Sequence, residues 1–235
     1  MSDAMTYWAA NIPWSFRDLK EKPSYETRRE MRYNLQDYMA STIPFKGYSG
    51  KSVLEIGCGA GLDSAEFARN GARVTAIDFT DTAVKETLST FGEAKVSGTV
   101  LQMDARALVF EPRSFDLVYS FGVLHHIPEY RTALSEVRRV LKDDGHFIGM
   151  FYNKDSLLWS YSIEHLGLSI ERVPGVPFAE PYSKAELQSL LSDFFREVTI
   201  TTHFNVIDTP TERKVKVGVD DRFGVGWHHI VNCNK

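Results

Sequence analysis

Three glycines at alternate positions, Gly57, Gly59 and Gly61, follow an apolar run that ends at Ile56. Glycine is needed where a backbone turns sharply and then lies against a ligand, because a Cβ atom would clash or forbid the required dihedral angles. A dinucleotide fingerprint would read G-x-G-x-x-G, but its third glycine position holds Leu62. The spacing predicts a nucleotide-binding turn and disfavours a dinucleotide pyrophosphate as its ligand.

Acidic residues stand in or after three apolar, strand-like runs, at Glu55, Asp78 and Asp104. Asp78 comes 21 positions after Gly57, which leaves room for a crossover helix and a second parallel strand and matches the offset of a ribose-binding acid. A carboxylate there can accept from both ribose hydroxyls. Each acid alone could be a solvated residue at a strand end. The occurrence of all three at corresponding places in successive strands favours a nucleoside-binding site.

Two adjacent histidines, His125 and His126, follow the fourth apolar run. Histidine is the commonest general base, and a positioned base accelerates a reaction ~100- to 10,000-fold. The pair could remove a proton from an acceptor, or it could shape the loop and cap the helix that follows Pro128; both interpretations remain open. After the fifth run, Tyr152 could lie against a cation or bond an acceptor, and Asn153 offers a donor and an acceptor, unless the two are a buried polar pair.

Metal chemistry and disulfides are not expected. His228 and His229 are neighbours in an expected strand and point to opposite faces, so they cannot both bind one metal, and we interpret them as structural. The two cysteines, Cys58 and Cys233, are 175 positions apart, and Cys58 is most simply a small residue in a tight space.

Together these motifs resemble the class I S-adenosylmethionine-dependent methyltransferases. The first motif of that family is an acidic residue in a strand followed by G-x-G-x-G, matched here from Glu55 to Gly61. The later matches, in order, are VTAID at 74–78, LQMDA at 101–105, and FDLVYS at 115–120 running into VLHHIP at 123–128. Four motifs in order over about residues 50–152 are far more specific than a glycine turn alone.

The resemblance implies a doubly wound α/β fold with a seven-stranded, mostly parallel, Rossmann-like sheet, and S-adenosyl-L-methionine as cofactor. Asp78 would bind the ribose hydroxyls, and Asp104 would contact the adenine. The N-terminus of the helix that begins near Gly61 would bind the methionine carboxylate. The expected cofactor-binding residues are Glu55, Gly57, Cys58, Gly59, Gly61, Asp78, Phe79, Asp104, Ala105 and Phe121. The candidate catalytic residues are His125, His126 and Tyr152, and the candidate acceptor-binding residues are Tyr7, Trp8, Trp14, Asn153 and Trp159.

The elements that must position these residues alternate between strand and helix, which is typical of a parallel sheet. The expected strands are 52–57, 73–78, 98–103, 115–120, 145–151, 196–202 and 226–232, the last two forming the antiparallel hairpin that the resemblance implies. Asp143 to Gly145 predicts a turn before the fifth strand. Helical spacing predicts two buried helix faces, formed by Val84, Leu88 and Phe91 and by Leu134, Val137 and Leu141.

We expect one domain over residues 1–235. An aromatic-rich cap covers 1–48, either closing over the cofactor or simply covering the sheet, and the cofactor-binding core covers 49–151. Prolines, glycines and apolar residues in 152–182 predict a substrate lid. Ser183 and Glu186 form a capping box that opens the C-terminal part, 183–235, which completes the sheet.

Composition limits the partners. The net charge is −4 and the pI about 6.0, which argues against a nucleic acid, and the most basic segment, 17–32, is interpreted as a solvated helix face. No apolar run approaches the ~20 residues of a membrane span, and the N-terminus lacks a signal layout, so a cytoplasmic location without a membrane partner is expected.

The leading hypothesis is methyl transfer to an oxygen or nitrogen of a small, specialised-metabolite acceptor in an enclosed, partly apolar pocket. A nucleic-acid methyltransferase is disfavoured by the charge and by Ser120 to Val123, which lack a D/N-P-P-Y string. A protein that uses the cofactor for another reaction, or as a structural ligand, remains an alternative. The glycine spacing opposes a nicotinamide-dependent oxidoreductase.

Overall fold

The computed structural model describes residues 2–16, 19–159, 178–204, 206–208, 214–216 and 226–235. The strands of the main sheet are β1 (Ser52–Ile56), β2 (Arg73–Asp78), β3 (Thr99–Gln102), β4 (Phe115–Phe121), β5 (Leu141–Tyr152), β6 (Glu197–His203) and β9 (His228–Asn234). A separate antiparallel pair is formed by β7 (Val206–Asp208) and β8 (Lys214–Lys216). The α-helices are α1 (Ser2–Ala10), α2 (Tyr25–Leu35), α3 (Met39–Thr42), α4 (Leu62–Arg69), α5 (Asp81–Ala94), α6 (Tyr130–Val140) and α8 (Lys184–Ser192). Two short 3₁₀ helices are η1 (Phe45–Tyr48) and η2 (Leu124–His126).

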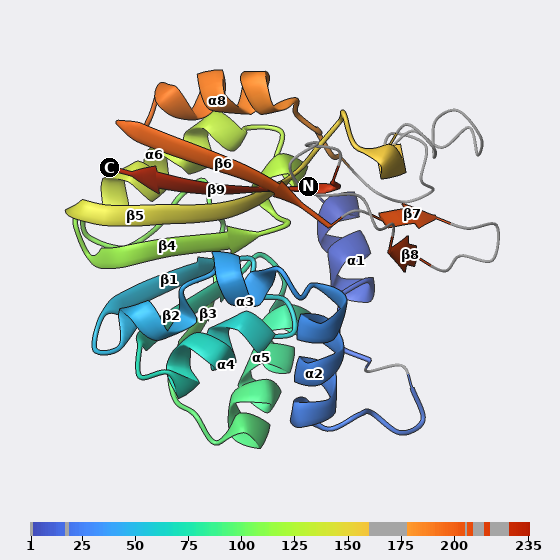
Figure 1. Ribbon diagram of the computed structural model, residues 1–235. Coiled ribbons are helices and arrows are strands. Elements are labelled where there is room, and N and C mark those ends of the chain that lie inside the picture. The colour runs from blue at the N-terminus through green and yellow to red at the C-terminus, as the bar shows by residue number, and fades with distance from the viewer. Residues whose placement is uncertain (1, 17–18, 160–177, 205, 209–213, 217–225) are drawn as a thin grey trace.

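The seven strands form one sheet in the order β3-β2-β1-β4-β5-β9-β6 (Figure 1). Strands β1 to β5 pair in parallel, and β9 pairs antiparallel with both β5 and β6. This arrangement confirms the predicted doubly wound, mostly parallel α/β fold.

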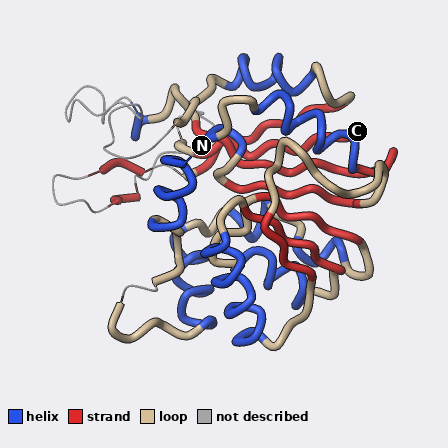
Figure 2. The backbone as a smooth tube through the Cα atoms, turned by 180° about the vertical axis from the view of Figure 1, so that it is seen from behind, coloured by secondary structure: helices blue, strands red, loops and turns tan. Residues whose placement is uncertain are grey.

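Side chains that alternate along each strand divide the core into two layers, one on each face of the sheet. On β1, Val53 belongs to the same apolar cluster as Phe67 of α4. Its neighbour Leu54 belongs to the opposite cluster, with Val137 of α6 and Leu187 of α8. Helices therefore cover both faces, as the front and back views show (Figures 1 and 2).

The predicted turn before the fifth strand is wrong. β5 begins at Leu141, which pairs with Phe115, and regular pairing resumes where His146 faces Leu117. The intervening residues form an irregularity within the strand, and Asp143 stays 72% exposed there. A bulge of this kind inserts residues without ending the strand, so the acids remain in water.

The predicted buried face of α5 is wrong at Leu88 and confirmed at Phe91, which is 4% exposed. Leu88 is 52% exposed, and the buried face carries Ala83, Thr87, Thr90 and Phe91. Thr87 Oγ1 donates to the carbonyl of Gly59 at 3.1 Å, and Thr90 Oγ1 to that of Ala60 at 2.7 Å. Because buried backbone carbonyls of the glycine turn need partners, α5 turns its threonines inward in place of Leu88.

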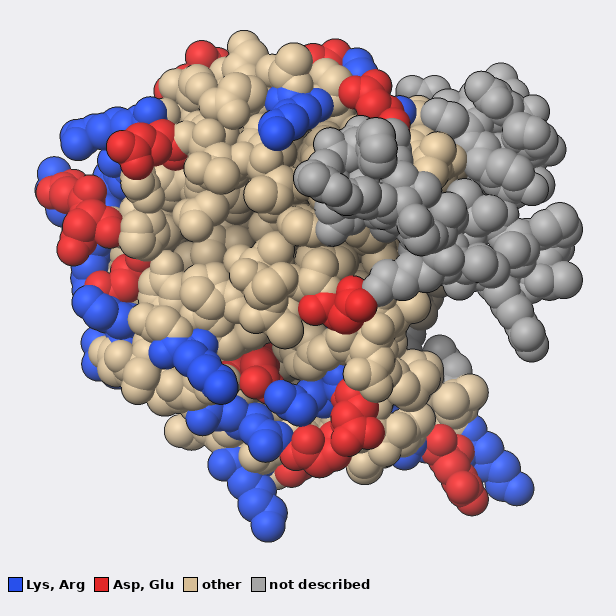
Figure 3. Space-filling view, viewed as in Figure 1, with Lys and Arg blue, Asp and Glu red and all other residues tan. Residues whose placement is uncertain are grey.

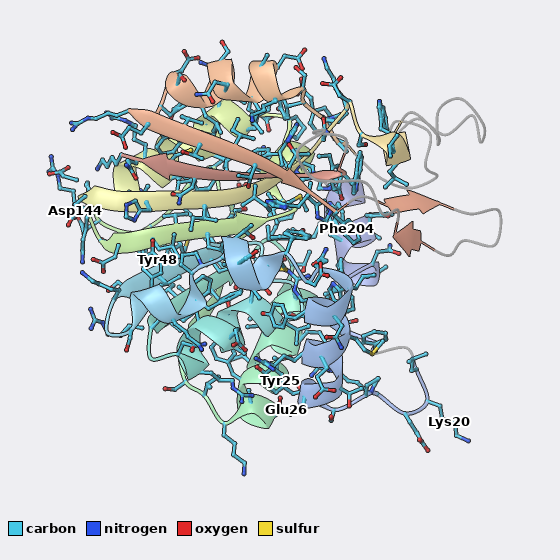
Figure 4. The ribbon with its side chains drawn as sticks, in the orientation of Figure 1. Lys20, Tyr25, Glu26, Tyr48, Asp144 and Phe204 are labelled. Atoms are coloured by element: carbon cyan, nitrogen blue, oxygen red, sulfur yellow. The ribbon has the colours of Figure 1, made fainter. Side chains whose placement is uncertain are left out.

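The basic segment before β1 is only in part the solvated helix face that was predicted, because Glu26 and Glu30 of α2 are exposed but two of its arginines are buried. Arg28 of α2 is fully buried, and it donates to Thr90 Oγ1 at 3.2 Å and to both carboxylate oxygens of Glu93 at 3.0 Å. Arg29 Nε donates to Glu66 of α4 at 2.6 Å. Arginines therefore attach α2 to α4 and α5 in place of an apolar stripe. Tyr25 and Glu26 lie at the end of α2 farther from α1 (Figure 4).

Lys, Arg, Asp and Glu side chains alternate along the border of the face in Figure 3, where the described residues show no broad patch of one sign. Within the described part of the chain, no helix is long and apolar enough to cross a membrane. Most of the expected lid, residues 160–177, lies outside the described residues.

Candidate functional site

A cavity of about 690 Å³ opens where strands β1, β2, β4 and β5 end. Ile56, Asp78, Phe121 and Tyr152, each at or near a strand end, line it. Trp8 of α1 and Arg32 of α2 add a wall from the N-terminal region, and Phe204 and His228 add a wall from the C-terminal strands. In Figure 4, Phe204 lies at the end of β6 near α1. The volume suits a ligand of cofactor or drug size.

The three glycines of the turn have positive φ angles, 76° at Gly57, 53° at Gly59 and 75° at Gly61. A Cβ atom on Gly57 would lie 2.2 Å from Val123 Cγ2, and one on Gly61 would lie 2.8 Å from Thr87 Cγ2. By contrast, a Cβ atom on Gly59 would meet only Ile12, at 3.7 Å, and Ile12 itself lines the cavity. Gly57 and Gly61 are therefore required for packing, while Gly59 keeps the backbone open toward the cavity.

Two of the predicted acids frame the glycine turn. Asp78 accepts from the backbone N–H of Gly59 at 3.1 Å and from the N–H of Thr80 at 2.9 Å. Burial nevertheless raises the pKa of Asp78. Asp104 is held by Arg106, whose Nη2 donates to it at 2.6 Å, and this hydrogen bond lowers the pKa of Asp104. Both carboxylates line the cavity.

A buried polar cluster lies beside the turn. Glu55 is 3% exposed and accepts from Ser64, and burial raises its pKa well above the usual range. Asp63 accepts from Arg32 Nε at 2.8 Å and Nη2 at 2.5 Å, and from the hydroxyls of Tyr33 and Tyr119 at 2.9 Å each. Arg32 and Asp63 line the cavity, so this ion pair forms part of its wall.

The structure separates the two adjacent histidines. His125 is fully buried behind the cavity wall, with its ring 4.0 Å from that of Tyr152, and burial pushes its pKa well below the usual range. His126 lines the cavity, and its Nδ1 lies 2.6 Å from the carbonyl oxygen of Phe178. A carbonyl only accepts, so Nδ1 carries the proton and Nε2 of the neutral ring carries a lone pair.

His126 Nε2 is buried without a hydrogen-bond partner among the described residues. Burial lowers the pKa of His126 to about 4, so the ring is neutral at physiological pH. A neutral imidazole with an unused lone pair at a ligand cavity is suited to accept a proton or a hydrogen bond.

Most of the predicted site residues come together in this cavity. The lining includes all ten predicted cofactor-binding residues, together with His126, Tyr152, Trp8 and Trp14. Four predicted residues are not part of the lining: His125, Tyr7, Asn153 and Trp159. Asn153 instead donates to the carbonyl of Gly226 at 2.8 Å and accepts from the N–H of Asp155 at 2.9 Å, which fixes the loop after β5.

Among the lining residues that sequence reasoning missed are Arg32, Asp63, Trp227 and His228. Tyr25, Arg28 and Arg32 share one helical face of α2, and this regular spacing was the available signal that the arginines are buried. Trp227 and His228 come from β9 or directly before it, about 75 residues after Tyr152, so only the antiparallel pairing of β5 with β9 brings them to the cavity.

Comparisons with known proteins agree with this geometry. Residues 54–149 match the family described as "Methyltransferase domain". A ubiquinone biosynthesis O-methyltransferase from Alkalilimnicola ehrlichii is 32% identical over 54% of this chain and 51% of its own length. The chain thus spans about half the length of this curated relative.

Among solved structures, a methyltransferase in complex with the Haloferax volcanii Trm112 activator has a TM-score of 0.66 and 17% identity, with 98% of this chain and 97% of that chain covered. The [4+2]-cyclase SpnF has a TM-score of 0.55 and 18% identity, with 78% of this chain and 63% of that chain covered. At these identities the likeness shows the fold alone. The family match, the four motifs and the seven-stranded sheet together support a class I S-adenosylmethionine-dependent methyltransferase domain at residues 54–149.

Proposed function

We propose that this chain transfers a methyl group from S-adenosylmethionine to an oxygen or nitrogen of a small-molecule acceptor, a specialised metabolite in class. The observation that carries the proposal is the single cavity that joins the glycine turn, Asp78 and the lone pair of His126. The residues fit the cofactor: Gly59 leaves its Cβ position open, and Asp78 and Asp104 offer acceptors to the nucleoside.

Bound S-adenosylmethionine would supply an electrophilic methyl group on its sulfonium. The chain's own residues position the acceptor against it, and positioning alone can lower a barrier by ~7 to 11 kcal/mol. His126 would accept the proton of the acceptor at Nε2. Arg32, held by Asp63, would place its guanidinium where an anionic group of a ligand can meet it.

Oxygen as the acceptor atom is supported by the curated relative, which is named an O-methyltransferase. A nucleic acid is disfavoured as acceptor, because the net charge is −4 and charges of both signs alternate on the face in Figure 3. A different reaction on the same fold is the alternative to test, since one structural neighbour is named as a cyclase.

Calorimetry and product analysis test the proposal together. S-adenosylmethionine is expected to bind one site per chain, and Asp78→Ala to weaken it at least tenfold, about 1.4 kcal/mol, because the ribose hydroxyls lose a charged acceptor. Asp81→Ala is the matched control, because the carboxylate of Asp81 is 60% exposed at the start of α5. Unchanged affinity in Asp78→Ala would refute the cofactor site.

Incubation with methyl-labelled S-adenosylmethionine and a panel of hydroxyl and amine compounds should yield labelled product and S-adenosylhomocysteine in equal amounts. Binding without S-adenosylhomocysteine release across the panel would favour the alternative of a different reaction.

A further inference from the structure

One arginine joins two acids at the part of the cavity wall that holds Asp104. Arg106 lies in the loop after β3, and Glu129 lies between η2 and α6. All three side chains line the cavity. The guanidinium of Arg106 donates to Asp104 from Nη2 at 2.6 Å and to Glu129 from Nη1 at 2.6 Å. Arg106 therefore connects two loops of the cavity wall through two carboxylates.

Arg106 occupies the acceptor sites of the Asp104 carboxylate. Oδ1 accepts from the backbone N–H of Arg106 at 2.9 Å and from Nε at 3.0 Å. Oδ2 accepts from Nε at 3.1 Å and from Nη2 at 2.6 Å. A carboxylate has about four lone-pair sites on its two oxygens, so a ligand can donate to Asp104 only where an arginine N–H leaves it.

The chemistry of the carboxylate limits which part of a nucleobase it can bind. The hydrogen bond from Arg106 lowers the pKa of Asp104, so the carboxylate is ionised at physiological pH and can only accept. Adenine has acceptors at its ring nitrogens and a donor at its 6-amino group. Asp104 can therefore meet adenine only through the amino group, which competes with Arg106 for the same oxygens.

Glu129 offers Arg106 a second position. Nη1 of Arg106 already donates to Oε2 of Glu129, whose side chain is 57% exposed. A guanidinium has five N–H donors in a planar fork, so it can turn further onto Glu129 without breaking this first contact. Arg106 then keeps a carboxylate partner in either position, and its charge is never left without one.

We propose that Arg106 is exchanged between the two acids: it holds Asp104 until the amino group of adenine takes its place, and Glu129 then holds the displaced guanidinium. Glu129 thereby becomes a specificity-determining residue for the nucleobase, although it acts through Arg106 and does not bind the base itself. The inference rests on the proposed function, because it concerns the nucleobase end of the same cofactor site.

A pair of ligands that differ only in the amino group tests the exchange. Calorimetry compares S-adenosylhomocysteine with its 6-deamino analogue, in which purine replaces adenine. The wild-type chain should bind S-adenosylhomocysteine at least tenfold more tightly, because the analogue lacks the hydrogen bond to a charged acceptor.

Glu129→Met removes the second position of Arg106 and leaves the arginine on Asp104. S-adenosylhomocysteine should then bind about tenfold more weakly, while the analogue should stay within about twofold of its wild-type affinity. The preference for the amino group should therefore disappear. General damage to the cavity would instead weaken both ligands.

Arg106→Met removes the competitor, and the backbone N–H of residue 106 can still hold Oδ1 of Asp104. This variant should keep S-adenosylhomocysteine within about threefold of its wild-type affinity, and adding Glu129→Met to it should cause no further loss. Arg131→Met is the control, because Arg131 pairs with Asp193 at 2.6 Å, both side chains are more than half exposed, and neither lines the cavity.

Three results would overturn the inference: unchanged affinities in Glu129→Met, an equal loss of both ligands, or a loss that persists when Arg106 is also Met, since Glu129 would then bind the cofactor directly. If Arg106→Met does not fold, the two ligands on Glu129→Met still decide, because Glu129 is exposed. Failure of the proposed function gives a different result, because S-adenosylhomocysteine would then not bind the wild-type chain and both proposals would fall. Equal binding of the two ligands to the wild type would overturn the exchange alone.

Discussion

At the scale of single residues, the surroundings of a side chain decide what its chemistry can be. His125 and His126 are adjacent in η2, yet the ring of His125 is buried against Tyr152 and the ring of His126 lines the cavity. The hydrogen bond to the carbonyl of Phe178 sets the tautomer of His126 and leaves Nε2 as its proton-accepting atom. Of the two histidines, His126 is therefore the candidate base.

His126→Ala should lower turnover ~100-fold with cofactor affinity nearly unchanged, because a positioned base is lost and the cofactor residues are not. The pKa of His126 is lowered to about 4, so the wild-type rate should hold from pH 7 down to about pH 5 and fall as the ring protonates near pH 4. A pH–rate profile with its acid limb near the usual histidine value of ~6.5 would contradict this role.

The glycines of the turn should respond differently to a side chain. Gly59→Ala should leave the fold nearly intact, at a cost of about 1–2 kcal/mol for the left-handed backbone, and should weaken S-adenosylmethionine by at least tenfold. Gly57→Ala should destabilise the fold by more, because its Cβ would overlap Val123. Chemical unfolding and calorimetry on both variants measure this contrast, and equal losses of stability would count against it.

At the scale of elements, buried arginines dock α2 onto the sheet helices. Arg28 reaches Thr90 and Glu93 of α5, and Arg32 reaches Asp63 of α4. Each arginine satisfies several acceptors at once, which a lysine could not do in the same geometry. The same docking carries Arg32 to the cavity wall, so the attachment of α2 and the shape of the site depend on each other.

Arg28→Met should lower the free energy of unfolding by about 2–3 kcal/mol, because Thr90 and Glu93 lose a charged donor in a buried setting. Arg113→Met is the matched control, because the Arg113–Asp143 pair is 65% and 72% exposed, and an exposed ion pair contributes little to stability. Urea unfolding of the two variants gives the comparison, and similar losses would mean that α2 is not held by its buried arginine.

At the scale of the whole molecule, burial of histidines links stability to pH. His229 is 1% exposed, its Nδ1 lies 2.9 Å from Thr202 Oγ1, and burial lowers its pKa to about 4. Its folded pKa thus lies below the unfolded value of ~6.5, so the unfolded chain binds more protons between these two values. Stability from this group is present above pH ~6.5 and is lost as the pH falls toward 4.

The stability difference between the wild type and His229→Gln isolates this contribution, because the other titrating groups are common to both chains. Between pH 7 and pH 4.5 the wild type should lose about 2 kcal/mol more than the variant. Urea unfolding at the two pH values provides the measurement. A difference that does not change with pH would show that His229 titrates normally in the folded chain.

The sequence by itself determined where the core strands lie along the chain, the glycine turn, and the positions of three acids in or after the strands. Those features depend on local chemistry and on short-range spacing, and both are visible in the residues 52–128. The capping box at Ser183 and Glu186 is equally local, and the structure confirms it.

Only the tertiary structure decided which face of α5 is buried and that Arg28 and Arg32 are buried. It also decided that His126 and not His125 lines the cavity, and that Trp8 and Trp227 line the same cavity. Each of these depends on contacts between residues far apart in the chain. Periodicity reports which residues are apolar, whereas the partners available in the folded chain decide which polar residues can be buried. That is why Leu88 is exposed, while Thr87, Thr90 and Arg28 lie inside.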